Sequence, residues 1–133
     1  MFVDASVIVS IVTDEDDGKT LAHDLDSAIN VITSPIAIWE AAASISRKTG
    51  RRAGQELPDI LTFIELAGIE IAPIDLAVSV AAIAAFDRYG RRSGHGADLN
   101  MGDCFAYAFA KSRGIPLLYK GKDFALTDLG RSV

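Results

Sequence analysis

The chain has 133 residues, half of them hydrophobic, which matches one ordinary domain with enough apolar side chains for a core. This composition excludes a disordered chain, and the single cysteine excludes an internal disulfide and suits a reducing cytoplasm. No secretory leader and no apolar run long enough for a bilayer is visible. We therefore expect one cytoplasmic domain, residues 1–133, without a membrane segment.

The net charge of −5 argues against a protein that binds nucleic acid over its whole surface, because such proteins show a basic footprint. The basic residues are nevertheless clustered, at positions 47–52 and again at 88–92. A local cluster is enough for a track of phosphate contacts, so the charge balance does not exclude a nucleic-acid partner.

Short apolar strands alternate with helices along the chain. Four segments are expected as strands: residues 1–4, 31–33, 69–71 and 116–119. The segments expected as helices are residues 6–12, 14–29, 35–49, 57–67, 75–89 and 101–113. This alternation predicts an α/β sandwich around a mostly parallel sheet.

Several helix ends are marked by capping residues. Ser34 is the expected N-cap of the third helix, with Pro35 at its first position, and Gly50 ends it. Gly114 closes the last helix, and residues 91–100 before that helix form a polar, glycine-rich loop. The acidic run 14–17 is expected to open the second helix, where negative charge suits the helix dipole, and otherwise to be solvated.

Three carboxylates interrupt apolar segments. Asp4 follows the first strand, Glu40 lies inside the apolar helix 36–43, and Asp103 stands in the first turn of the apolar helix 101–110. The helix around Glu40 is apolar nearly all round, so we expect it to be buried, with Trp39 as a core or dimer contact. A buried ionised carboxylate is costly unless it is compensated, so each of these acids needs a partner.

A shared divalent cation satisfies these acids economically, because most basic residues lie in polar loops and at helix ends. Mg²⁺ and Mn²⁺ are hard ions that prefer carboxylate oxygens. Ligands of open α/β sheets bind at the carboxyl ends of the strands, where Asp4 lies and where Asp123 follows the last strand. The simpler interpretations are that Asp4 is an N-cap, Asp103 a first-turn acid and Asp123 a turn residue.

Four segments in this order resemble PIN domains, and more narrowly the VapC toxins of bacterial type II toxin–antitoxin systems. The similarity covers nearly the whole chain, and its third segment is the most specific. The segments are Val3-Asp4-Ala5-Ser6, Trp39-Glu40-Ala41-Ala42, Leu99-Asn100-Met101-Gly102-Asp103-Cys104-Phe105-Ala106-Tyr107-Ala108 and Leu117-Leu118-Tyr119-Lys120-Gly121-Lys122-Asp123-Phe124.

The resemblance implies a three-layer α/β/α fold and Mg²⁺- or Mn²⁺-dependent cleavage of RNA. The positions that match the family's acidic metal and catalytic site are Asp4, Glu40, Asp103 and Asp123, and Ser6 matches a hydroxyl that supports the first of them. The resemblance also implies a homodimer and a VapB-type antitoxin that blocks the site. We expect the antitoxin helix to lie in an apolar groove formed by residues 60–64 and the region of Trp39.

Positive side chains near these motifs are candidates for contacts with RNA phosphates. The candidates are Arg91, Arg92 and Lys120. For any one of them, a solvated surface charge is the simpler interpretation.

Two other functions compete with the ribonuclease hypothesis. A phosphoacceptor receiver domain also gathers acids at strand ends, with a lysine after a late strand as at Lys120. It has no use for Glu40, however, and no strand-end aspartate lies mid-chain to accept a phosphoryl group. A non-catalytic PIN-like interaction module is the second alternative, and the intact set of four acids argues against it.

Overall fold

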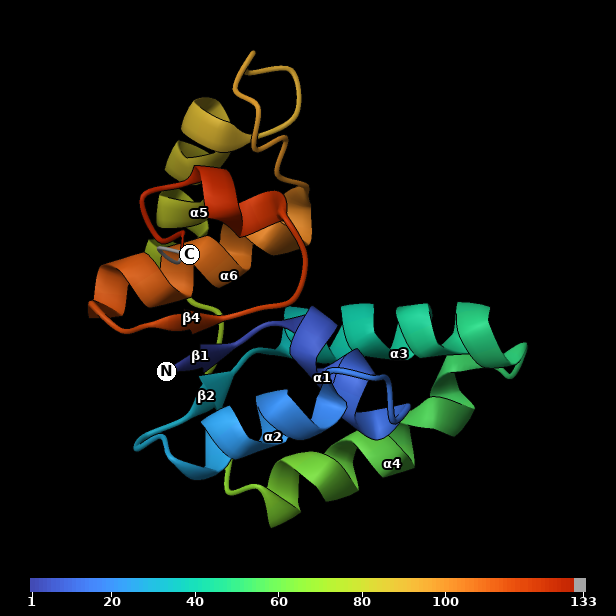
Figure 1. The fold of residues 1–133 in the computed structure, drawn as a ribbon. Coiled ribbons are helices and arrows are strands. Elements are labelled where there is room, and N and C mark those ends of the chain that lie inside the picture. The colour runs from blue at the N-terminus through green and yellow to red at the C-terminus, as the bar shows by residue number, and fades with distance from the viewer. Residues whose placement is uncertain (131–133) are drawn as a thin grey trace.

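Residues 1–130 of the chain are described in the computed structural model, and they form a parallel four-stranded sheet flanked by helices (Figure 1). The strands are β1 (Phe2–Val3), β2 (Ile32–Thr33), β3 (Glu70–Ile71) and β4 (Leu117–Leu118). Their order across the sheet is β3-β2-β1-β4, with Phe2 in register with both Ile32 and Leu117.

The order of the strands creates a switch point between β1 and β4. The chain runs outward from β1 to β2 and β3, then returns to pair β4 with the other side of β1. The backbone N–H of Asp4 donates to the Leu118 carbonyl at 3.0 Å and so extends this pairing to the carboxyl end of β1. In open α/β sheets, the crevice at such a point is where ligands bind.

The helices form two layers around the sheet, as the sequence predicts. Helices α5 and α6 pack on each other, and α6 covers β1 and β4, while α1 contacts α2, α3 and α4 on the other side (Figure 1). None of the helices within residues 1–130 combines the length and the hydropathy required to cross a bilayer. The helices are α1 (Ala5–Val12), α2 (Gly18–Asp26), α3 (Pro35–Thr49), α4 (Ala53–Leu66), α5 (Leu76–Tyr89), α6 (Met101–Arg113) and the 3₁₀ helix η1 (Asp123–Leu126).

Local capping sets the bounds of the two helices that carry Glu40 and Asp103. At the start of α3 the Ser34 side chain accepts from Ala37 N–H at 3.1 Å, and Gly50 ends the helix with a left-handed φ of 74°. Helix α6 ends in the same way at Gly114, where φ is 62°. Both helices have the bounds that the sequence predicts.

Two other helices begin elsewhere than expected. The acidic run 14–17 forms a turn, and α2 begins only at Gly18. Helix α4 begins at Ala53 rather than at Leu57, because the Gln55 side chain accepts from Arg52 N–H at 3.0 Å and closes a first turn within the mostly polar residues 51–56.

The core lies between the sheet and the two helical layers, with Phe2 and Phe109 stacked at 5.2 Å between ring centroids. Ile60 and Ile64 belong to this core, at 0% and 3% exposure, so these two side chains do not line a surface groove, whereas Leu61 between them is 41% exposed. The predicted antitoxin groove over residues 60–64 and Trp39 stays a prediction. Trp39 is 69% exposed, and so it is not a core residue. Helix α3 therefore has an outer face, in contrast to the prediction of a helix buried all round.

Candidate active site

Asp4 lies directly after β1 and caps α1. Its Oδ2 accepts hydrogen bonds from the Ser6 backbone N–H at 3.0 Å and from Ser6 Oγ at 2.6 Å. The side chain is buried, and burial raises the pKa of Asp4 although the Ser6 bonds oppose this shift. The N-cap interpretation of Asp4 is therefore correct, and Ser6 supports this carboxyl group as predicted.

Asp103 enters the same region from the first turn of α6. Its Oδ2 accepts from Asn100 N–H at 3.1 Å, and Asn100 Oδ1 accepts from Asp103 N–H at 2.9 Å, which forms a reciprocal capping box. Burial, and then the charges of Asp4 and Asp123, raise the pKa of Asp103 to about 6, although the Asn100 bond and the Arg91 charge oppose them. Asp103 therefore caps α6, as the simpler interpretation expects, and its carboxyl group also lies near other acids.

Glu40 projects from the second turn of α3 toward α6 and is half-buried. Burial, followed by the charges of Asp4 and Asp103, raises the pKa of Glu40 to about 7. Its carboxyl group lies against Gly102, where an added Cβ would come within 2.1 Å of Glu40 Oε2. Residue 102 must therefore be small for Glu40 to reach this position.

Asp123 is the first residue of η1, shortly after β4, and its side chain is exposed. It lines the same cleft as the other three acids, and its negative charge contributes to the raised pKa values of Asp4 and Asp103. The turn after β4 thus brings a fourth carboxylate to the edge of the sheet, at the place expected from the sequence.

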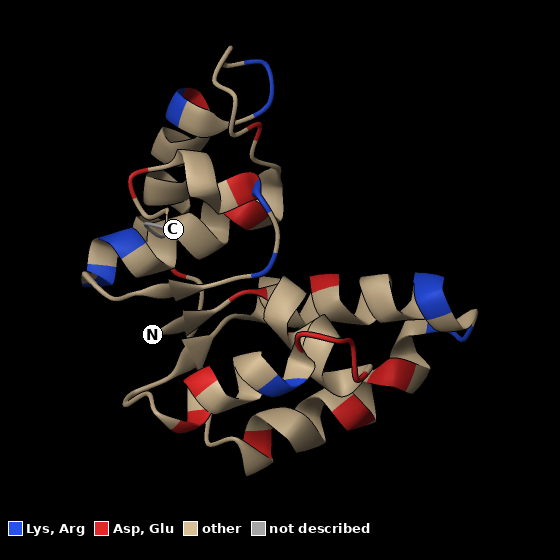
Figure 2. Cartoon of the chain, viewed as in Figure 1, with Lys and Arg blue, Asp and Glu red and all other residues tan. Residues whose placement is uncertain are grey.

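The four acids line one open cleft of about 530 Å³ at the carboxyl ends of β1 and β4. In Figure 2 the acidic segments at the end of β1, on α3 and in the first turn of α6 lie on this side of the sheet. The other residues that line the cleft are Ala5, Ser6, Val9, Glu15, Trp39, Ala43, Ser44, Arg47, Lys48, Lys120, Gly121 and Phe124.

The chemistry of this site suits a hard divalent cation. Burial is the main cause of the raised pKa values of Asp4, Glu40 and Asp103, and the charges of neighbouring acids in the cleft add to it. A shared cation would offset the cost of ionising these buried carboxyl groups. Within residues 1–130, no three Asp, Glu, His or Cys side chains already enclose a metal position. Mg²⁺ commonly takes only one or two protein carboxylates and completes its shell with water, so an open arrangement satisfies its requirements.

The three predicted RNA contacts lie in different surroundings. Lys120 lines the cleft, together with Arg47 and Lys48 from the basic cluster at positions 47–52. Arg91 is close enough to lower the pKa of Asp103 by its charge. Arg92 is exposed in the 91–100 loop and does not line the cleft.

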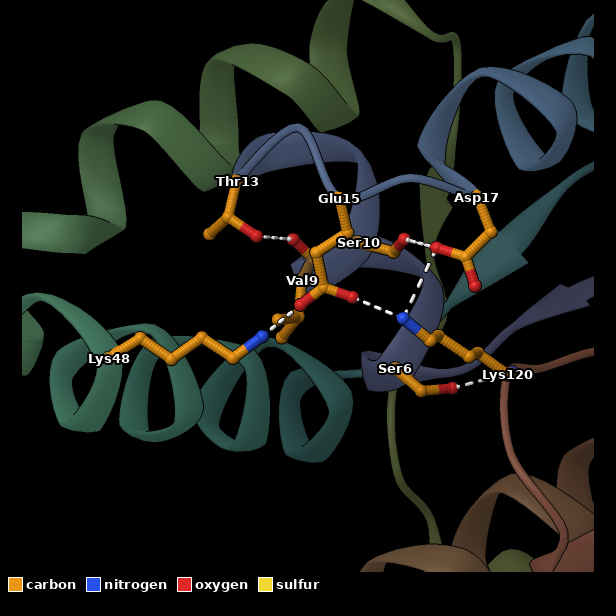
Figure 3. A network of polar contacts seen from close by, with 8 residues as sticks. All are labelled: Ser6, Val9, Ser10, Thr13, Glu15, Asp17, Lys48 and Lys120. Carbon is orange, nitrogen blue, oxygen red and sulfur yellow. Dashed lines mark hydrogen bonds and ion pairs between the residues drawn. The ribbon is translucent and has the colours of Figure 1, made fainter.

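Two members of the acidic run 14–17 are not simply solvated, in contrast to the prediction. Glu15 pairs with both Lys48 and Lys120, and Asp17 pairs with Lys120 at 3.2 Å and accepts from Ser10 Oγ (Figure 3). These contacts join segments far apart in the sequence, which is why a linear pattern gave no sign of them. The other missed residue is Gly102, for which a glycine inside a helix was the available signal.

The family model of the PIN domain matches residues 1–129, so the chain belongs to the PIN-domain family. A VapC ribonuclease of Rhizobium meliloti (strain 1021) is 41% identical to it, over 97% of this chain and 99% of that protein. A ribonuclease VapC of Mycolicibacterium smegmatis is 38% identical, over 97% of each. The predicted VapC-type PIN domain is confirmed, and the receiver-domain alternative is dropped.

Two solved structures share the fold at low sequence identity. Mycobacterium tuberculosis VapC20, described as a sarcin–ricin loop cleaving toxin, superimposes with a TM-score of 0.73 at 18% identity, covering 96% of this chain and 94% of that chain. A toxin–antitoxin complex from Klebsiella pneumoniae gives a TM-score of 0.69 at 16% identity, covering 98% and 95%. At these identities the likeness establishes the fold.

Proposed function

We propose that this protein is a Mg²⁺- or Mn²⁺-dependent endoribonuclease that hydrolyses RNA phosphodiester bonds in the cytoplasm, as the toxin of a toxin–antitoxin pair. The observation that carries the proposal is the meeting of Asp4, Glu40 and Asp103 at the switch point of the sheet, with raised pKa values and no basic side chain bonded to them among residues 1–130. The ribonuclease names of the relatives support the nuclease assignment.

The four acids divide naturally by their surroundings. Asp4 and Asp103 are held by hydrogen bonds from their own helix starts, so they suit direct ligation of the ion. Glu40 and Asp123 approach from separate elements and suit a second ion or metal-bound waters. Ser6 fixes the orientation of Asp4 through the 2.6 Å hydrogen bond.

A bound divalent ion supplies an activated water and stabilises negative charge on the phosphate and the leaving oxygen. The protein's part is to hold the ligands ionised and in place. Since Asp103 titrates near pH 6 and Glu40 near pH 7, cation binding must displace protons from them below neutrality. Cation affinity therefore rises with pH through this range.

The direct test is RNA cleavage by Asp4→Asn and Asp103→Asn in the presence of Mg²⁺ or Mn²⁺. Each variant is expected to lose at least about a hundredfold in rate, because a ligand charge is removed and the shape is kept. Glu65→Gln is the matched control, since it removes one charge on the outer side of α4. Cleavage by either site variant at the wild-type rate would falsify the assignment.

Calorimetric titration of the wild-type protein with Mg²⁺ and Mn²⁺ separates the enzyme from the non-catalytic alternative. The enzyme proposal expects binding of at least one of the two ions that weakens in Asp103→Asn. A protein that binds neither ion in the absence of a partner is better explained as an interaction module.

An exposed apolar side chain at the cleft is a candidate contact for the expected VapB-type antitoxin. Trp39 is exposed on α3 and lines the cleft opening beside Glu40, so an antitoxin segment that packs on it also covers the acids. Co-expression with a cognate VapB-type antitoxin is expected to give a complex that cleaves no RNA, and expression of the protein alone is expected to arrest growth. Harmless expression without a bound partner contradicts the toxin role.

The expected homodimer has a candidate contact surface on α5. One side of this helix carries three exposed apolar residues at helical spacing, Leu76, Val80 and Ile83. The exposed side chains of Phe86 and Met101 extend this patch. A two-fold interface pairs the same patch on both copies. Light scattering is expected to give a dimer for the wild type and a monomer for Ile83→Glu, and a monomeric wild type contradicts the proposal.

A further inference from the structure

Figure 3 shows a network of charges around Glu15. Three of its members, Glu15, Lys48 and Lys120, line the same cleft as the four acids. The two carboxylate oxygens of Glu15 accept from different lysines, Oε1 from Lys48 near the end of α3 and Oε2 from Lys120 after β4. Asp17 Oδ1 accepts from Lys120 as well, at 3.2 Å. One carboxylate thus holds two ammonium groups from distant parts of the chain side by side.

The turn that carries Glu15 is fixed by hydrogen bonds at several points. The Glu15 backbone N–H donates to the Ser10 carbonyl at 2.9 Å, and Ser10 Oγ donates to Asp17. Asp14 adopts a left-handed φ of 54°, and Thr13 Oγ1 donates to the Val9 carbonyl at 2.7 Å. Because the turn is anchored on α1, the position of the Glu15 carboxylate is set by the fold.

The two lysines are also tied to the acidic site itself. The Lys120 backbone N–H donates to Ser6 Oγ at 3.0 Å, and Ser6 Oγ donates to Asp4. Lys48 and Lys120 both line the cleft that contains the four acids. An anion held by the two ammonium groups therefore lies beside the acidic site.

We propose that Glu15 is a positioning residue that arranges Lys48 and Lys120 as a paired phosphate site for the RNA strand, next to the phosphodiester that is cleaved. The inference rests on the proposed ribonuclease function and adds to it the place where a second phosphate of the same strand binds.

The number of unused N–H donors on the two lysines indicates that they can still bind a phosphate while paired with Glu15. Each ammonium group has three N–H donors. Within residues 1–130, Lys48 uses one of them and Lys120 uses two, so three donors are available to a phosphate. Their side chains are 49% and 41% exposed, while that of Glu15 is only 22% exposed, so the cations face solvent and the carboxylate lies behind them.

The test combines RNA cleavage kinetics with RNA binding. A phosphate bound outside the reaction centre contributes equally to the ground state and the transition state, so Glu15→Gln is expected to raise KM and leave kcat nearly unchanged. The expected rise is about threefold, the scale of a partly exposed charge contact. Glu65→Gln, which removes the same charge away from the cleft, is the matched control.

Binding is measured separately by fluorescence anisotropy of a labelled oligouridylate, with every variant in the Asp103→Asn background. Lys48→Gln and Lys120→Gln are each expected to lower the slope of log Kd against log salt by about 0.7. In the Lys48→Gln/Lys120→Gln double variant, adding Glu15→Gln is expected to change nothing further, because Glu15 acts through the two lysines.

Three results overturn the inference. Tighter RNA binding by Glu15→Gln shows that the Glu15 carboxylate competes with RNA for the lysines. A change in KM and RNA affinity no larger than that of Glu65→Gln shows that Glu15 has no role in RNA binding. An undiminished Glu15→Gln effect in the double-lysine background shows that it acts elsewhere. Because binding is read in the Asp103→Asn background, failure of the ribonuclease proposal, seen as undiminished cleavage by Asp103→Asn, is a separate result.

Discussion

Two groups of carboxylates in this molecule have opposite electrostatic surroundings. Asp128 accepts from Lys111 Nζ at 2.6 Å and from the Tyr107 hydroxyl at 2.7 Å, and these contacts lower its pKa. In the cleft, burial and mutual repulsion raise the pKa values of Glu40 and Asp103. The fold supplies Asp128 with a bonded cation, whereas no Lys or Arg is hydrogen-bonded to Glu40 or Asp103 within residues 1–130. This contrast is what the proposed external cation would explain.

The two groups therefore respond to pH in opposite directions. Glu40 and Asp103 have raised pKa values in the folded protein, so their contribution to stability is complete below the unfolded values of 4.5 and 3.8 and is lost as pH rises through about 6 to 7. Asp128 has a lowered pKa, so its contribution is present above 3.8 and is lost as pH falls through the folded value.

Among substitutions outside the directly ligating acids, Gly102→Ala is expected to have the largest effect on RNA cleavage, because the new Cβ would come within 2.2 Å of either Glu40 oxygen and displace the carboxylate. RNA cleavage is expected to fall by about a hundredfold, as for other small misplacements of reacting groups. The melting temperature should be nearly unchanged, because the displaced group is the end of a flexible side chain.

Gly54→Ala in α4 is the control for Gly102→Ala, because a Cβ at residue 54 has no neighbour within 4 Å. Initial rates with Mg²⁺ are compared for both variants. If Gly102→Ala cleaves RNA within twofold of wild type, the position of Glu40 does not matter for activity.

Added Mg²⁺ or Mn²⁺ is expected to stabilise the protein at pH 8 by about 2.7 kcal/mol when the ion is in hundredfold excess over Kd. At pH 5 the gain should be much smaller, since Glu40 and Asp103 are then largely protonated. Thermal unfolding at both pH values measures the difference. An equal gain at pH 5 and pH 8 means that the ions bind somewhere other than this cleft.

Glu40→Gln is expected to raise the melting temperature of the metal-free protein at pH 8 by about 3 °C. The substitution removes a partly buried negative charge that is repelled by Asp4 and Asp103. At pH 5 the wild-type side chain is protonated, and the difference should disappear. Glu65→Gln controls for the change in net charge. A lower melting temperature for Glu40→Gln at pH 8 contradicts the proposed repulsion.

Asp128→Asn is expected to have the smallest effect, a loss of stability in contrast to the gain expected for Glu40→Gln. It removes the ion pair with Lys111 but keeps an oxygen for the Tyr107 hydroxyl, so it should cost about 0.5 kcal/mol at pH 7. Urea unfolding measures the loss. A stabilised Asp128→Asn protein would remove the contrast between the two groups of carboxylates.

Local signals in the sequence predicted the elements whose ends are set by neighbouring residues. Ser34, Pro35 and Gly50 define α3 completely, because capping depends on residues within one turn. The start of α4 was missed because residues 51–56 are mostly polar and show no apolar periodicity of helical spacing. Asp4, Glu40 and Asp103 were recognisable because charges inside apolar runs need compensation. Asp123 was predicted from its position after the last strand and from the resemblance to PIN domains.

The sequence by itself determined the α/β fold, the VapC-type PIN family and the identity of the acids that meet at the switch point. Only the tertiary structure decided which side of α3 faces solvent, the close approach of Glu40 to Gly102, and the pairing of Glu15 with Lys48 and Lys120. The physical reason is distance along the chain. Caps and apolar periodicity act within a few residues, whereas the cleft and its rim exist only once β1, α3, α6 and the segment after β4 are brought together.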